Sequence, residues 1–276
     1  KHWSRVSDFS GDQFFECPDM FALPVDGDSR NTRWVLMDAA FRYWIGTFDG
    51  QEFRPEAGPL RGDYGANFYA AQSWNNTGSR IVQIGWMKGG KYPGMPFNQQ
   101  MSFPCELSLR TTPAGLRLFR MPVAEIERLR VACDSASDRR LHAGEELRIG
   151  RSGDLFDIAA EIEASPDAAF SIRLHDTSIA YSEGAIRCLD KEAEARSADA
   201  VTRLRILLDR TSIEVFVNDG AIGMSSCILP AERETTVRCC AERGSIRVRR
   251  MAVHHLASAW NDPHANDVES EGAGGA

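Results

Sequence analysis

The stretch from Leu204 to Gly220, LRILLDRTSIEVFVNDG, predicts two β-strands joined by a short turn. Leu204 to Leu208 and Ser212 to Val217 are rich in Ile, Leu and Val, and the residues between them are polar. Asn218-Asp219-Gly220 then supplies the next chain reversal. Short runs of this kind, separated by turns, recur along most of the chain, so the sequence predicts an all-β protein.

The same pattern continues on both sides of this stretch. Alternating runs at Leu155 to Glu161, Ala169 to Leu174 and Ser245 to Val253 complete the strand spacing of a C-terminal β-sandwich, which we place at residues 138–256. From about Ser258 the composition shifts to Asn, Asp, Glu, Ala and Gly, so residues 257–276 are predicted to form a disordered tail.

Residues 1–121 contain two consecutive sets of four predicted strands, and units of this length are typical of β-propeller blades. Residues 122–137 form a predicted linker, in which Pro122 to Arg130 has the apolar spacing of a short helix. The first set of strands is Cys17 to Leu23, Arg33 to Met37, Arg42 to Phe48 and a short run at Phe53, and the second is Phe68 to Trp74, Arg80 to Met87, Pro104 to Arg110 and Leu116 to Met121.

Composition excludes several classes of function. With 43% hydrophobic residues the chain of 276 residues is globular, and no apolar run approaches the roughly 20 residues of a membrane span. A net charge of -7 and a pI near 5.5 argue against nucleic acid as a partner and favour small neutral substrates. The seven cysteines and six histidines lack metal-ligand spacing, so no metal and no other cofactor is expected. The cellular compartment and the oligomeric state stay open.

Near the start, Phe14 to Phe21, FFECPDMF, places Glu16 between aromatic residues and a Cys-Pro corner. Aromatic neighbours suggest a partly desolvated pocket that would keep the acid protonated, as a general acid requires. The alternative is that Glu16 ends an edge strand and points into water.

Five blocks of sequence, in order, resemble glycoside hydrolase family 32, the family of invertases, levanases and exo-inulinases. They are Phe15 to Asp19, Asp63 to Trp74, Gln83 to Met87, Met101 to Arg110 and Asp209 to Gly220. The resemblance covers residues 1 to about 256. It implies the C-terminal blades of a five-bladed β-propeller followed by a β-sandwich, in a retaining hydrolase that releases terminal β-D-fructofuranosyl units from fructans or sucrose.

The resemblance also implies roles for single residues. Glu16 takes the place of the general acid/base. Cys17, which we count among the substrate-binding residues, lies directly behind it and either tunes Glu16 or packs against it. Asp63 resembles a ligand of sugar hydroxyls, and its alternative is an Asp that forms a turn before Tyr64-Gly65. Trp86 resembles the tryptophan that lines the fructose pocket, and its alternative is a blade-core aromatic. Three further residues of these blocks are expected to be packing or rim residues: Tyr69, Gln72 and Trp74.

The chain departs from the family in two motifs. The family's nucleophile lies in an Asn-Asp-Pro motif and a transition-state ligand in an Arg-Asp-Pro motif, and neither occurs before Glu16. We therefore expect this chain to be the C-terminal part of a longer enzyme and to be inactive alone. Asn261-Asp262-Pro263 resembles the missing motif, but no strand pattern follows it. A non-catalytic fructan-binding protein is the alternative function, and neither the preferred fructan nor export can be read from the sequence.

Overall fold

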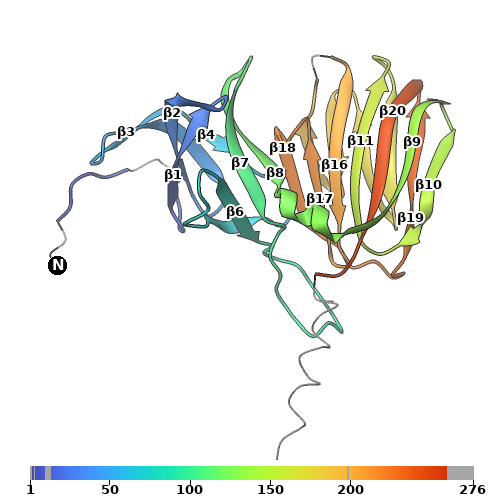
Figure 1. The fold of residues 1–276 in the computed structure, drawn as a ribbon, viewed down its shortest axis with the longest axis horizontal. Helices are drawn as coiled ribbons and strands as arrows, with labels where there is room; N and C mark the ends of the chain where they lie inside the picture. The colour runs from blue at the N-terminus through green and yellow to red at the C-terminus, as the bar shows by residue number, and fades with distance from the viewer. Residues whose placement is uncertain (1, 3, 10–13, 198, 260–276) are drawn as a thin grey trace, which may run out of the picture.

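The computed structural model describes residues 2, 4–9, 14–197 and 199–259, and it consists almost entirely of β-strands (Figure 1). Two modules lie side by side, an N-terminal sheet and a C-terminal sandwich. Nearly all of the predicted tail, with the Asn261-Asp262-Pro263 motif, lies outside the described residues. Within the described part of the chain, no helix has the length and apolar character that a membrane crossing needs.

The N-terminal sheet consists of two antiparallel units of four strands, as the sequence predicted. The strands lie in the order β4-β3-β2-β1-β7-β6-β5, and β8 pairs with β7. The parallel pairing of Val25 with Leu109 links β1 of one unit to β7 of the other. Their bounds are β1 (Asp19–Val25), β2 (Asp28–Met37), β3 (Arg42–Phe48), β4 (Phe53–Arg61), β5 (Tyr69–Ser73), β6 (Ile81–Trp86), β7 (Cys105–Thr112) and β8 (Gly115–Pro122).

The C-terminal module is a sandwich of two six-stranded sheets, in the orders β10-β19-β12-β13-β14-β15 and β18-β17-β16-β11-β20-β9. Apolar side chains from both sheets form one continuous core between them. The bounds are β9 (Arg130–His142), β10 (Glu146–Gly153), β11 (Phe156–Ala164), β12 (Ala169–Leu174), β13 (Thr177–Ser182), β14 (Ala185–Cys188), β15 (Lys191–Glu194), β16 (Val201–Leu208), β17 (Ser212–Val217), β18 (Ile222–Cys227), β19 (Thr235–Arg243) and β20 (Ser245–Leu256).

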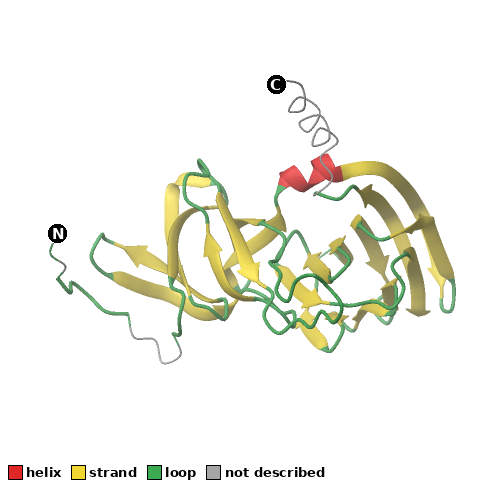
Figure 2. Cartoon of the chain, turned by 90° about the horizontal axis from the view of Figure 1, so that it is seen from below, coloured by secondary structure: helices red, strands yellow, loops and turns green. Residues whose placement is uncertain are grey.

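The predicted connector helix is shorter than expected and has a different geometry. It is the 3-10 helix η1 (Ala124–Leu129), and it lies at the junction of the two modules (Figure 2). Pro122 belongs to β8, where it pairs with Cys105, so the helix cannot begin there. At the other end Arg130 already pairs with Leu256 of β20, so the predicted linker is largely strand.

A smaller apolar cluster joins the two modules. Val82 and Cys105 from the N-terminal sheet pack with Ile126 of η1 and with Leu207 and Phe216 of the sandwich. This cover explains why all six residues of β17 are buried, although the outward face of an antiparallel sheet is commonly solvated.

Candidate active site

Glu16 and Cys17 form a strained corner immediately before β1. Their φ angles are 49° and 43°, in the left-handed region that non-glycine residues seldom occupy. Such residues cost about 1–3 kcal/mol each and persist only where the surroundings hold them. Here the backbone N–H of Ala39 lies 3.1 Å from the carbonyl oxygens of both Phe15 and Glu16. The loop between β2 and β3 therefore holds this corner in place through the Ala39 N–H.

That loop is fixed by a buried carboxylate. Asp38 is fully buried, and its Oδ1 accepts hydrogen bonds from the N–H groups of Ala40 and Arg42, both at 3.0 Å. Its Oδ2 accepts from Nε and Nη2 of Arg42 at 2.9 and 2.6 Å. Because a buried charge needs a full set of partners, this arrangement keeps the Ala39 peptide in one orientation.

Tyr69, the first residue of β5, contacts Glu16 directly. Its phenol donates to Glu16 Oε2 at 2.8 Å, and this hydrogen bond raises the pKa of Tyr69. The next residue, Ala70, donates its N–H to the Ala39 carbonyl at 2.7 Å. The Ala39 peptide thus joins the Glu16 corner to the strand that carries Tyr69.

Trp86, the last residue of β6, pairs with Tyr69 across the strands. Their ring centroids are 6.2 Å apart with an interplanar angle of 73°, an edge-to-face contact. The ammonium group of Lys88 lies 4.0 Å from the Tyr69 centroid and 6.0 Å from that of Trp86, and Gln99 accepts a hydrogen bond from the Trp86 indole. The structure therefore brings Glu16, Tyr69 and Trp86 together.

Cys17 is half-buried and contributes its backbone to this site. Its carbonyl accepts a hydrogen bond from the Gln72 side chain at 3.1 Å, and Asp19 accepts one from the Ser73 N–H at 2.7 Å. Tyr69 and Gln72, which the sequence placed at the rim or in the packing, both contact the Glu16 corner. The signal that could have found them is their place in the Asp63 to Trp74 block.

Asp63 lies elsewhere, in the seam between the modules. It is buried, its Oδ1 accepts the Gly65 N–H at 2.7 Å, and its Oδ2 pairs with Arg120 and accepts from Ser225 Oγ at 3.0 Å. Both oxygens are thus occupied by the protein. This geometry corresponds to the turn-forming alternative, strengthened by an ion pair, and it does not support the predicted contact with sugar hydroxyls.

The aromatic shell expected around Glu16 is not formed by its neighbours in sequence. Phe14 turns toward Trp44, with ring centroids 5.5 Å apart, while Phe15 is 56% exposed. Glu16 is itself exposed among the described residues. Its aromatic contact comes instead from Tyr69, a residue far away in the chain.

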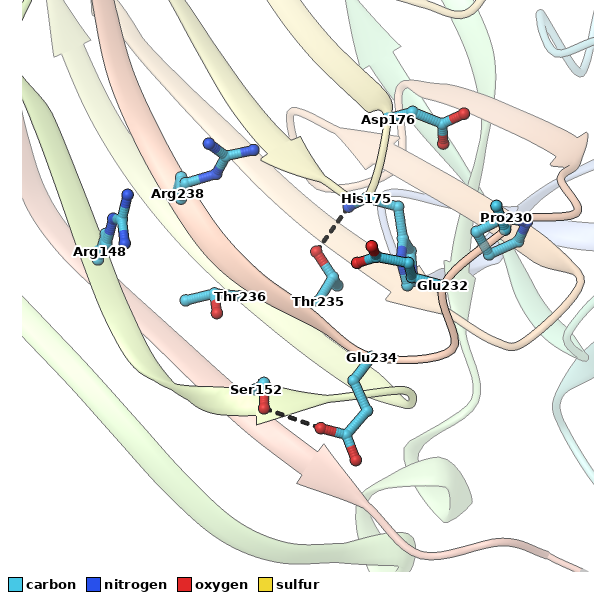
Figure 3. Close-up of a pocket in the computed structure, with 11 residues that line it drawn as sticks. Arg148, Ser152, His175, Asp176, Pro230, Glu232, Glu234, Thr235, Thr236 and Arg238 are labelled. Atoms are coloured by element: carbon cyan, nitrogen blue, oxygen red, sulfur yellow. Dashed lines mark hydrogen bonds between the residues drawn. The ribbon is translucent and has the colours of Figure 1, made fainter.

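A cavity of about 480 Å³ lies on the sandwich, away from the residues around Glu16 (Figure 3). Figure 3 shows Arg148 and Arg238 at one side and Glu232 and Glu234 at the other. Burial lowers the pKa of His175 in its wall. Most of its lining side chains are exposed, and we assign no chemistry to it. In the described part of the chain, no group of three or more His, Cys, Asp or Glu side chains has the arrangement of a metal site.

Comparison with known proteins identifies both modules. A model of the glycosyl hydrolases family 32 N-terminal domain matches residues 1–122, and a model of the glycosyl hydrolases family 32 C terminal matches residues 125–255. A levanase of Bacillus subtilis is 30% identical over 311 residues, covering 94% of this chain and 46% of the levanase. An extracellular exo-inulinase of Aspergillus niger is 26% identical, covering 95% of this chain and 59% of its own length. The chain thus spans about half the length of the curated relatives it matches.

Solved structures give the same fold. The exo-inulinase of Aspergillus awamori superimposes with a TM-score of 0.76 at 23% identity, over 92% of this chain and 60% of that protein. Fructan 1-exohydrolase IIa of Cichorium intybus gives 0.71 at 20% identity, over 88% and 62%. The architecture is therefore that of propeller blades followed by a β-sandwich, and the chain belongs to glycoside hydrolase family 32.

Proposed function

We propose that this chain carries the acid/base part of a retaining β-fructosidase, with Glu16 as the general acid/base. The observation that supports it most is the hydrogen bond from Tyr69 to Glu16 Oε2. Because Oε2 accepts this bond, the proton of the acid form belongs on Oε1, which has no partner among the described residues. Glu16 can then present that proton to the departing glycosidic oxygen.

In a retaining mechanism, protonation by Glu16 accompanies attack of a second carboxylate on the anomeric carbon. The fructosyl-enzyme ester is then hydrolysed by water, from which Glu16 takes a proton. We assign Trp86 to the wall of the fructose pocket, since its ring lies beside Tyr69. Cys17 packs behind Glu16, and its carbonyl anchors Gln72. Terminal β-D-fructofuranosyl units of fructans or sucrose are the proposed substrates, because the relatives are named levanase and exo-inulinase.

We also propose that no described residue supplies the nucleophile. Asp19 and Asp38 lie in the same blade as Glu16. However, Asp38 is buried in an ion pair with Arg42, and Asp19 accepts a hydrogen bond from the Ser73 N–H. The 276-residue chain should then release essentially no fructose from sucrose, inulin or levan. A fusion protein in which the family's N-terminal blades, with the Asn-Asp-Pro motif, precede this chain should be active.

The decisive variant is Glu16→Gln in that fusion protein. Loss of the acid should lower turnover on sucrose by about a hundred- to ten-thousandfold. An aryl fructoside with a good leaving group should lose much less, because its departure needs little protonation. Glu52→Gln, an exposed glutamate of the β3–β4 hairpin, is the matched control. Unchanged turnover on sucrose would refute the role of Glu16, and fructan binding without hydrolysis by the wild-type fusion would favour a non-catalytic binding protein.

A further inference from the structure

The edge strand of the sandwich, β18, is hydrogen-bonded to the segment that leads into β5. The N–H of Tyr64 donates to the Gly223 carbonyl at 2.7 Å, and the N–H of Asn67 donates to the Ser225 carbonyl at 3.0 Å. Between them, Gly65 lies so close to Ser225 that a Cβ at Gly65 would collide with its backbone. The two modules therefore meet backbone to backbone immediately before the strand that begins with Tyr69.

The side chain of Asn67 extends this link in two directions. Its Oδ1 accepts the N–H of Cys227 in β18 at 2.9 Å, and its Nδ2 donates to the carbonyl of Lys88 at 2.8 Å. One neighbour can only donate and the other can only accept, so the orientation of the amide is fixed by its partners. Asn67 is thus bound to the sandwich on one side and to the segment after β6 on the other.

One segment held by Asn67 reaches Glu16, and the other covers the Tyr69 ring. Tyr69 follows Asn67 by two residues and donates to Glu16 Oε2, and the Lys88 ammonium lies 4.0 Å above the Tyr69 ring. A shift of Asn67 would therefore move the phenol, the cation over it, or both. The polar contacts around Asp63 and Arg120 join the segment before β5 to β8.

We propose that Asn67 is a positioning residue through which strand β18 of the sandwich sets the placement of Tyr69 beside Glu16 and of Lys88 over the Tyr69 ring. The importance of this placement for catalysis rests on the proposed function, but the placement itself does not. The sandwich then helps to determine the geometry of the acid/base site.

The test uses the full chain labelled with ¹³C at Cζ of tyrosine, with the Tyr69 resonance assigned through Tyr69→Phe. Between about pH 3 and 6, where glutamates ionise, the Tyr69 resonance should move as its acceptor gains a charge, and Glu16→Gln should abolish that movement. Asn67→Ala removes both side-chain bonds and should reduce the movement strongly. Asn67→Asp keeps an acceptor for Cys227 but loses the donor to Lys88, so it should give an intermediate reduction. Asn31→Ala, at an exposed position of β2, is the control and should leave the signal unchanged.

Thermal unfolding of each variant separates placement from stability. Folded Asn67→Ala and Asn67→Asp proteins with the wild-type movement of Tyr69 would overturn the proposal. If Asn67→Ala does not fold, the Asn67→Asp protein decides, and failure of both to fold would assign Asn67 to stability alone. Since this measurement needs no turnover, an inactive enzyme would refute the proposed function and leave the placement result intact.

Discussion

The Tyr69 phenol forms a hydrogen bond with one of the two carboxyl oxygens of Glu16. It donates to Oε2 at 2.8 Å, so in the proposed mechanism Oε1 carries the proton. Glu16 and Cys17 have left-handed backbone angles, and such strain persists only where the surrounding structure holds it.

Replacement of Tyr69 by Phe should therefore weaken catalysis without removing the acid. A hydrogen bond to a charged group is worth about 1.5–3 kcal/mol, so kcat/KM of the fusion protein should fall at least about tenfold. Tyr181→Phe in the sandwich, where the ring stacks on Phe170, is the control. A Tyr69→Phe enzyme with the wild-type kcat/KM would show that the contact has no part in catalysis.

The contacts of two single residues could not be predicted from the sequence. The motif around Glu16 placed this residue immediately before the first strand of a blade, yet it could not show that Phe14 turns away toward Trp44. Nor could it show that Asp63 pairs with Arg120, 57 positions further along the chain. Both outcomes depend on contacts between distant segments, and such contacts leave no local pattern.

Among the elements, the sequence of β17 predicts a strand but does not predict that both of its faces are buried. Its sequence, SIEVFV, alternates, and this pattern would place Glu214 on a solvated face. The N-terminal module covers that face, so Glu214 is fully buried. Strands rich in β-branched residues, such as β16 and β17, were predicted from sequence. Strand β18 (IGMSSC) and strand β15 (KEAE) were not, because neighbouring strands rather than their own propensity hold them.

The hydrogen bonds around Glu214 indicate that it is protonated in the folded protein. Ser225 Oγ lies 2.7 Å from Glu214 Oε2, 3.0 Å from Asp63 Oδ2 and 3.1 Å from Arg120 Nη2. A hydroxyl has one proton, which cannot serve two carboxylates at once. If Glu214 carries a proton, it donates to Ser225, and Ser225 donates to Asp63. Burial raises the pKa of Glu214 to about 7, which agrees with this arrangement.

This group should make the stability of the chain depend on pH. Its folded pKa of about 7 lies above the ordinary 4.5, so its stabilisation is complete below about pH 4.5 and is lost as the pH rises through 7. The loss by pH 8 amounts to about 3 kcal/mol. Glu214→Gln stays neutral, and its amide can donate to Ser225 and accept from the Phe103 N–H. The variant should therefore have a higher Tm than wild type at pH 8 and a flatter dependence of Tm on pH.

Melting curves from pH 5 to 8 would measure this difference, with Glu163→Gln as the control, because the Glu163 side chain near the end of β11 is partly exposed and pairs with Arg249. Charged or titratable groups around Glu214 are Arg120, Asp63, Cys105 and Cys227. The thiol pKa values of both cysteines are raised, so neither thiol accounts for a transition below pH 8. Equal slopes of Tm against pH in wild type and Glu214→Gln would contradict a protonated Glu214.

At the scale of the whole molecule, each module has its own main core, and a further apolar cluster lies at the seam. The sandwich core is formed only by residues of the sandwich, apart from the partly buried Tyr64 at its edge. The N-terminal sheet has a separate core around Phe41 and Tyr43. Between the modules, the guanidinium group of Arg120 lies 4.3 Å from the Phe68 ring centroid and 5.4 Å from that of Phe216. The seam combines cation–π contacts, an ion pair and apolar packing, and it resembles an interior more than a surface.

We expect the sandwich to fold without the N-terminal module, but its first strand must be intact. The sequence placed its start at residue 138, whereas β9 begins at Arg130 and pairs with β20 along its whole length. Arg130 also pairs with buried Asp157 at 2.6 Å, and Asp157 would keep only Arg205 if Arg130 were removed. A polypeptide of residues 125–256 should therefore unfold in one cooperative transition, at a higher temperature than one of residues 138–256.

Calorimetry of both polypeptides, with Arg130→Ala in the longer one to isolate the ion pair, measures each contribution. Equal transition temperatures for the two lengths would show that the first half of β9 adds nothing to the sandwich, and no transition in either would mean that the seam is needed for folding.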